Sequence, residues 1–416
     1  MKSLAIILLV FFSTFLSAQT LIPQNIEVTC AADHMARPSY IPAPDLLLRS
    51  KALSRFEFIY TDSVPEEAKI AIEYAGKIWS SFLESEIPIR VAIKWSTFEG
   101  STFLGTGGPR GYFRLDTLVP KPGLLYPIAL AESLFSRNFN GENEDIGVSI
   151  NSSYDWYYGL DGNVRQRHHD LVTLVLHEIG HGLGFNSSDR ITDEGMGKFS
   201  TPPRIFDAFL GIQNPFIGGT ENYLYLTDTT IYNNPSFELF DQFVSERIVF
   251  ADASVKHANS NQFVWIYSPS EYGRSSLSHL DNLQRDPRRL GDALMDPFLA
   301  RQEAIHRPGP ITLAILSAMG WRVDFHATVT SISDLPKKEL MLFPNPVIDH
   351  LQISWPEALP MQVPYQITDI SGRIVQTGQI TQNQTLPLTN FKPGYYHLNL
   401  QDAEAIYYGK FVIGSR

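Results

Sequence analysis

The chain has almost no cysteine, no excess of positive charge, and no long apolar run after its first residues. Cys30 is the only cysteine among 416 residues, so an intrachain disulfide is excluded. The formal net charge of -11 argues against a nucleic-acid partner and against a polybasic membrane anchor. No later stretch is apolar enough to form a transmembrane segment. We therefore expect a soluble protein whose stability does not depend on disulfides.

The first residues have the pattern of a signal for secretion. Lys2 is followed by an apolar run from Leu4 to Leu16 and then by the small residues Ser17 and Ala18. We predict a signal peptide over residues 1–18 and a mature protein that begins near Gln19.

Two segments in the first half lack a clear period. Residues 19–52 are irregular and rich in proline and alanine, which indicates a pro-segment or an extended lead-in. The Gly- and Pro-rich region 100–141 is predicted to form loops. Residues 188–278 are predicted to be an insertion whose fold the pattern does not define.

The regular patterns between these segments predict a mixed α/β domain over residues 53–325. Ser63 and Glu66 form a capping-box pattern that predicts the start of a helix. The predicted strands are 56–60, 88–95 and 145–150, and the predicted helices are 63–79, 170–183 and 311–319.

The period changes after Val323. A polar linker is predicted over residues 326–339, and residues 340–416 contain short alternating runs separated by turn residues. This pattern predicts a separate, small all-β sandwich.

The motif H-E-x-x-H at residues 177–181 carries the chemistry. On a helix, His177 and His181 lie one turn apart on the same face, so both imidazoles can bind one Zn²⁺ ion. Glu178 lies beside them and can take a proton from the attacking water. A helix with two surface histidines that bind no metal could have the same motif. The surrounding residues must therefore distinguish a metal site from such a helix.

Glycines just after the second histidine indicate that the helix ends and the chain turns there. Gly182 and Gly184 each weaken a continuing helix by about 1 kcal/mol relative to alanine. A turn at this point would bring in a third ligand, because a catalytic zinc needs three protein ligands and one open position. The candidates for this third ligand are Asp189, His257, His279 and His306.

The motif resembles the signature of the metzincin peptidases, H-E-x-x-H-x-x-G-x-x-H. It matches through Gly184 but has Ser187 at the last position, so the third ligand must come from elsewhere. The resemblance implies an α+β domain with a mixed sheet and an active-site helix. It also implies a methionine turn, which we assign to Met295 in ALMDP; Met319 is a rival that its helical apolar stripe marks as a core residue. In the leishmanolysin branch a long insertion precedes the third histidine, and this implies His279.

Two weaker signals concern regulation and a second metal. Pro-segments in this superfamily hold the enzyme inactive with a thiol on the zinc, so Cys30 is a possible inhibitory thiol; a lone unreactive cysteine is the alternative. The acidic stretches 141–145 and 151–162 are possible Ca²⁺ ligands, although they lack the spacing of an EF-hand loop.

The C-terminal segment resembles the sorting domain of proteins exported through the type IX secretion system. The matching motifs are FPNPVIDHLQI, TDISGRIV, LTNFKPGYYHLNL and GKFVI. The resemblance implies export through the periplasm of a Gram-negative cell, with the secretion machinery as a partner.

Together these patterns predict a secreted or surface-attached zinc endopeptidase that acts on proteins or peptides. Two alternatives remain open: a catalytically silent adhesin on the same scaffold, and a zinc hydrolase of other amides. The presence of Glu178 favours an enzyme, because a scaffold needs the histidines but not the base.

Overall fold

The computed structural model describes most of the chain. The described residues are 21–23, 28–44, 52–99, 101–214, 223–281, 292–325, 337–354, 363–369, 374–381, 385–388, 391–401 and 406–414. The predicted signal peptide and most of the predicted linker lie outside them. The chain divides into two compact units, residues 1–328 and 329–416.

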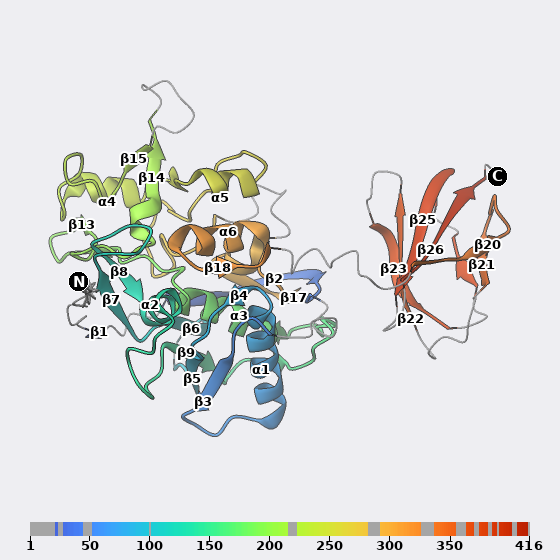
Figure 1. Ribbon diagram of the computed structural model, residues 1–416, viewed down its shortest axis with the longest axis horizontal. Helices are drawn as coiled ribbons and strands as arrows, with labels where there is room; N and C mark the ends of the chain where they lie inside the picture. Colours follow the sequence, from blue (N-terminus) through green and yellow to red (C-terminus); the bar gives the residue numbers. More distant parts are fainter. Residues whose placement is uncertain are drawn as a thin grey trace, which may run out of the picture. The chain divides into compact units, whose positions relative to one another are not determined.

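A six-stranded mixed sheet organises the first unit (Figure 1). The strand order is β17-β2-β6-β9-β5-β3. Strands β3, β5 and β9 run parallel, β6 runs antiparallel to both β9 and β2, and β17 runs parallel to β2. The strands are β2 (Val28–Ile41), β3 (Phe56–Tyr60), β5 (Ile89–Ser96), β6 (Phe103–Pro109), β9 (Ile146–Asn151) and β17 (Phe298–Ile305).

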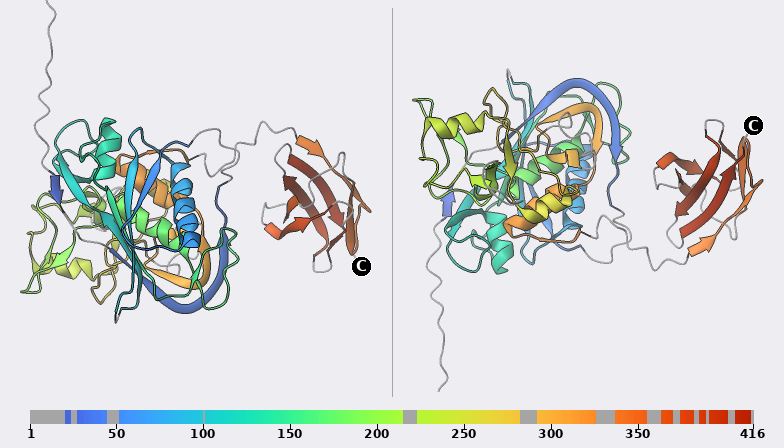
Figure 2. Two further views of the ribbon diagram at one scale, coloured as in Figure 1. Left: turned by 90° about the horizontal axis from the view of Figure 1, so that it is seen from below. Right: turned by 90° about the horizontal axis from the view of Figure 1, so that it is seen from above.

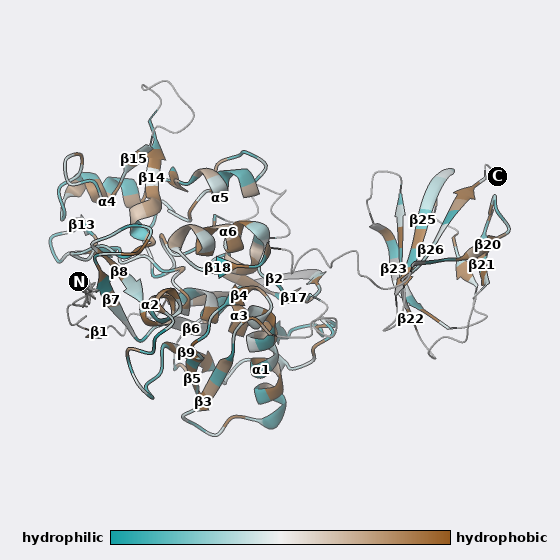
Figure 3. Ribbon diagram, in the orientation of Figure 1, coloured by the Kyte–Doolittle hydropathy of each residue, from teal (hydrophilic) through white to brown (hydrophobic). Residues whose placement is uncertain are grey.

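Helices α1 (Glu66–Ser80) and α3 (Leu171–Gly182) pack against each other in the first unit. The Trp79 indole N–H of α1 donates a 3.1 Å hydrogen bond to the carbonyl of Leu176 in α3. Buried residues recur every three or four positions along α1, as expected for a helix with one face in the core. Figure 3 shows hydrophobic and hydrophilic residues on this helix. A third helix, α6 (Pro310–Met319), is almost entirely buried.

The predicted capping box at Ser63 and Glu66 is wrong. Pro65 is the N-cap of α1, and no side chain caps the helix. Proline suits this position because its fixed φ, here -57°, is compatible with the helix that follows.

Residues 28–41 form strand β2, although their sequence shows no strand period; the interpretation of residues 19–52 as a pro-segment or an extended lead-in stays a prediction. Strand β2 lies between β6 and β17, and Figure 2 shows β2 and β17 following one long curve. The pairing depends on main-chain hydrogen bonds to distant strands, which leave no period in the local sequence.

The prediction of loops over residues 100–141 is also wrong. This region contains β6, β7 (Gly111–Leu115), β8 (Leu124–Pro127) and α2 (Ile128–Phe135). Strand β6 escapes detection because glycines replace the apolar residues of the usual alternation. A Cβ atom on Gly107 would lie 2.8 Å from the Cα of Glu178, so glycine is required for α3 to approach the sheet.

The region predicted to be an insertion has its own small elements. A three-stranded sheet has the order β15-β14-β16, and β12 and β13 form a two-stranded ribbon that packs against α4. A second short helix, α5, contacts α6. The bounds are β12 (Arg190–Ile191), β13 (Gly197–Lys198), β14 (Leu210–Gln213), β15 (Tyr223–Tyr225), α4 (Phe237–Phe243), β16 (Ile248–Phe250) and α5 (Ala253–Ala258).

The second unit consists of strands around a separate apolar core. A five-stranded sheet has the order β19-β26-β25-β22-β23, and a three-stranded sheet has the order β20-β21-β24. Leu351, Ile367, Leu398 and Phe411, which come from both sheets, are buried in this core. The bounds are β19 (Lys337–Glu339), β20 (Met341–Phe343), β21 (His350–Ser354), β22 (Val363–Asp369), β23 (Ile374–Ile380), β24 (Leu386–Pro387), β25 (Gly394–Gln401) and β26 (Ile406–Ile413).

Candidate metal centre

Helix α3 positions two histidines and a glutamate in the interior of the first unit. Asp170 caps the helix by accepting a 2.8 Å hydrogen bond from the backbone N–H of Thr173. The helix ends at Gly182, and Gly184 has a φ of +119°, which turns the chain. His177, Glu178 and His181 are all buried.

The structure brings His279 to the two histidines of α3. The Nε2 atom of His181 lies 3.0 Å from that of His177 and 3.2 Å from that of His279, and the third separation is 3.3 Å. Zinc bonded to three imidazoles at about 2.0–2.1 Å in tetrahedral geometry would separate the nitrogens by roughly 3.3–3.4 Å. The triangle of nitrogens therefore has nearly the size that a zinc ion requires.

Backbone carbonyls fix the protonation of all three rings. The Nδ1 atoms of His177, His181 and His279 lie 2.6, 2.7 and 2.7 Å from the carbonyl oxygens of Leu294, Phe185 and Ser275. Because a carbonyl only accepts, each Nδ1 carries the proton and each Nε2 presents a lone pair.

Burial also keeps these imidazoles neutral. It lowers the pKa of His177 to about 4 and lowers the pKa values of His181 and His279 well below the usual range. Three lone pairs thus face one another with no proton between them. A cation held by the three Nε2 atoms would relieve this repulsion, and nitrogen ligands of this kind suit zinc.

Met295 packs against helix α3, and the turn that contains it also supports His177. A Cβ atom on Gly180 would be 2.7 Å from the Met295 sulfur, so this side chain packs against α3 between the two histidines. The neighbouring Leu294 supplies the carbonyl that His177 binds. Met319 packs instead near Gly184, beyond the end of α3.

Cys30 faces the same site from strand β2. Ligand atoms of Cys30, His177 and Glu178 lie within 4.8 Å of one another. Cys30 pairs with Gly105 of β6, and a Cβ atom on Gly105 would lie 3.1 Å from Oε1 of Glu178, so both positions face α3. Burial raises the pKa of the Cys30 thiol, and the charges of Glu178 and Glu303 raise it further.

The other three candidates for the third ligand lie outside the histidine cluster. His306 is 2.8 Å from the carboxylate of Asp170, at the opposite end of α3. His257 is exposed on α5. Asp189 accepts a 2.7 Å hydrogen bond from the hydroxyl of Tyr272.

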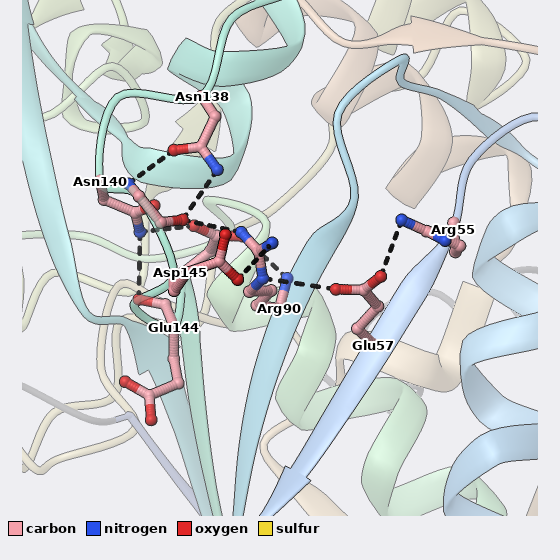
Figure 4. Close-up of polar contacts among 9 residues, drawn as sticks. Arg55, Glu57, Arg90, Asn138, Asn140, Glu144 and Asp145 are labelled. Carbon is pink, nitrogen blue, oxygen red and sulfur yellow. Dashed lines mark hydrogen bonds and ion pairs between the residues drawn. The ribbon is translucent and has the colours of Figure 1, made fainter.

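The acidic stretch 141–145 joins a polar network with β5 (Figure 4). The Asp145 carboxylate accepts hydrogen bonds from the backbone N–H of Arg90 and from Nδ2 of Asn140, each 2.8 Å long. Burial raises the pKa of Asp145 to about 7. Glu142 pairs with the Arg90 guanidinium at 3.1 Å. These contacts occupy oxygens that a Ca²⁺ ion would need, and calcium binding stays a prediction.

The carbonyl groups of Leu294, Phe185 and Ser275 are functional groups that the sequence analysis missed. No sequence signal identifies a backbone carbonyl that orients a metal ligand, because any residue type supplies one. Only the turns that position them, marked by Gly184 and Pro297, are visible in the sequence.

Comparisons with known families concern two parts of the chain. The model for the secretion system C-terminal sorting domain matches residues 341–414, so the second unit carries a sorting tail of type IX secretion. A model described as SPBPB7E8-like matches residues 123–200, which include α3 and both of its histidines. No curated protein matches the chain.

The sorting tail identifies the protein as one exported to the cell surface or the medium, with the secretion machinery as its partner. The prediction that the C-terminal segment is a type IX sorting domain is confirmed. Among the helices of the described residues, none has the length and apolar character needed to span a bilayer.

Proposed function

We propose that the first unit is a zinc-dependent endopeptidase of metzincin type, in which His177, His181 and His279 hold the metal. The observation that carries the proposal is the convergence of three buried, neutral Nε2 atoms at 3.0–3.3 Å, each fixed by a carbonyl behind it. When bound, zinc would act as a Lewis acid that acidifies water and polarises the scissile carbonyl.

Glu178 is the proposed general base. It follows the first ligand on α3, and its carboxylate is held close to His177. It takes a proton from the attacking water and delivers it to the amine that leaves. A carboxylate that only stabilised the fold would not need to lie beside the ligands.

The position of Cys30 supports a latent form of this enzyme. Strand β2 fills the edge of β6 beside the metal centre, and the thiol lies near His177 and Glu178. A thiolate that binds the metal would take the position that the attacking water requires. Removal of β2 would then free the metal and would also expose the main-chain groups of β6 and β17, which both pair with β2.

Casein hydrolysis tests the proposed function. The full-length protein would be assayed before and after limited proteolysis of its N-terminal segment, with a chelator and with zinc added back. We expect the proteolysed form to hydrolyse casein. The chelator should abolish this hydrolysis, and added zinc should restore it. Glu178→Gln should keep its zinc and lose at least 100-fold in kcat, because only proton transfer is removed. Hydrolysis that survives both the chelator and Glu178→Gln would refute the proposal.

A further inference from the structure

A cavity of about 400 Å³, lined by both polar and apolar groups, lies next to the metal centre. Its walls come from the turn after α3, from the loop that precedes His279, and from the start of β2. Residues of these three segments line it: Val28, Ser187, Asp189, Tyr272, Ser276 and Ser278. Its volume is within the range of pockets that bind small ligands or side chains.

The loop that precedes His279 contributes both to the cavity wall and to the support of a metal ligand. Ser278 is the neighbour of His279 in the chain, and its hydroxyl accepts a 3.0 Å bond from the backbone N–H of Ser187. The carbonyl of Ser275 orients the His279 ring, while the Ser275 hydroxyl donates to the carbonyl of Thr29 in β2. One loop therefore supports a metal ligand and walls the cavity.

Strand β2 shows how a bound chain would reach the cavity. Val28 and Cys30 lie two residues apart in regular pairing with Gly107 and Gly105 of β6, so their side chains share one face. The Cys30 thiol lies at the metal site, and Val28 lines the cavity. An extended peptide that replaced β2 along β6 would place one side chain in the cavity and a peptide bond near the metal.

The chemistry of the wall favours a cationic side chain. The carboxylate of Asp189 accepts a hydrogen bond from Tyr272, which leaves acceptor sites on its oxygens. Among the described residues no ion pair involves Asp189. The hydroxyl oxygens of Ser187 and Ser276 accept from the backbone N–H groups of Asp189 and Gly273. Arg274, also in the lining, is exposed to solvent.

We propose that this cavity is a substrate subsite beside the cleaved bond and that Asp189 makes it select lysine or arginine. The inference rests on the proposed peptidase function and specifies its substrate class. A guanidinium or ammonium group would form a charge-assisted hydrogen bond with the Asp189 carboxylate, partly shielded from water. Asp189 thus determines specificity and takes no part in the chemical step.

Matched peptides test the subsite. Full-length protein, activated by limited proteolysis, would be given peptides that carry arginine, citrulline, leucine or glutamate at one position next to the cleaved bond. Citrulline has the shape of arginine without its charge, so the wild-type protein alone already tests the carboxylate. We expect kcat/KM for the arginine peptide to exceed that for the citrulline peptide by about tenfold or more. Asp189→Asn should bring this ratio close to one while zinc content and leucine-peptide cleavage persist.

The control is Asp193→Asn, which removes the same charge from an exposed position in the nearby β12–β13 turn and should leave the ratio unchanged. A wild-type ratio near one, a preference for glutamate set by Arg274, or an unchanged ratio in Asp189→Asn would overturn the inference and leave the peptidase function standing. Failure to cleave any peptide, including the leucine peptide, would refute the peptidase function and the subsite with it.

Discussion

Gly107→Ala tests the contact on which the position of helix α3 depends. The new Cβ atom would lie 2.8 Å from both Cα and the carbonyl carbon of Glu178, and closer still to its carbonyl oxygen. The new Cβ atom meets backbone atoms of Glu178, which cannot rotate away as the end of a side chain could, so α3 or β6 must shift. Overpacking of this kind costs about 1–3 kcal/mol and occasionally more. For a unit of this size that corresponds to a fall in Tm of roughly 2–10 °C.

Calorimetry of the full-length variant measures this fall, and zinc content measures the shift of the ligands. The matched control is Gly273→Ala, where a Cβ atom would meet nothing within 4 Å. We expect the control to keep the wild-type Tm and zinc content, whereas Gly107→Ala loses stability and binds zinc more weakly. If both variants melted at the wild-type temperature with full zinc, the close approach of α3 to β6 would be refuted.

Three further predictions concern the base, the thiol and the sorting tail. Glu178→Ala should retain one zinc per chain yet lose at least 100-fold in casein hydrolysis, as kinetics and metal analysis would show; wild-type activity would exclude it as the base. Cys30→Ala should make the unprocessed chain cleave a short fluorogenic peptide about tenfold faster than the wild-type chain does, because the thiol no longer competes for the metal. Equal rates would contradict an inhibitory thiol. Deletion of residues 341–414 should leave the first unit folded while the protein accumulates in the periplasm, as cell fractionation would show. Normal export of the truncated protein would refute the role of this segment as an export signal.

The sequence predicts the parts of the site that depend on local spacing. His177 and His181 share a helical face because they are four residues apart, and the helix that carries them has a clear apolar period. The structure places His279 with them, as the order of histidine and methionine turn implies. That step depended on a family resemblance, since nothing in the local pattern distinguishes His279 from His257.

The parts that the sequence could not predict depend on contacts between distant segments. Strand β2 is defined by its pairing with β6 and β17, and its own residues show no alternation. The glycines of β6 indicate a loop when taken alone, and only the approach of α3 explains them. The position of Cys30 beside Glu178 follows from both features, so it became visible only with the sheet in place.

Zinc binding by His279→Ala, compared with His257→Ala, tests the central claim most directly. Both substitutions remove one imidazole from the full-length protein, but His279 lies in the cluster of buried nitrogens and His257 is exposed on α5. Competition with a chromophoric chelator would give the affinity of each variant. We predict one zinc per chain in the wild type and in His257→Ala, and an affinity at least about 100-fold lower in His279→Ala. Stoichiometric zinc with native affinity in His279→Ala would contradict the three-histidine metal centre.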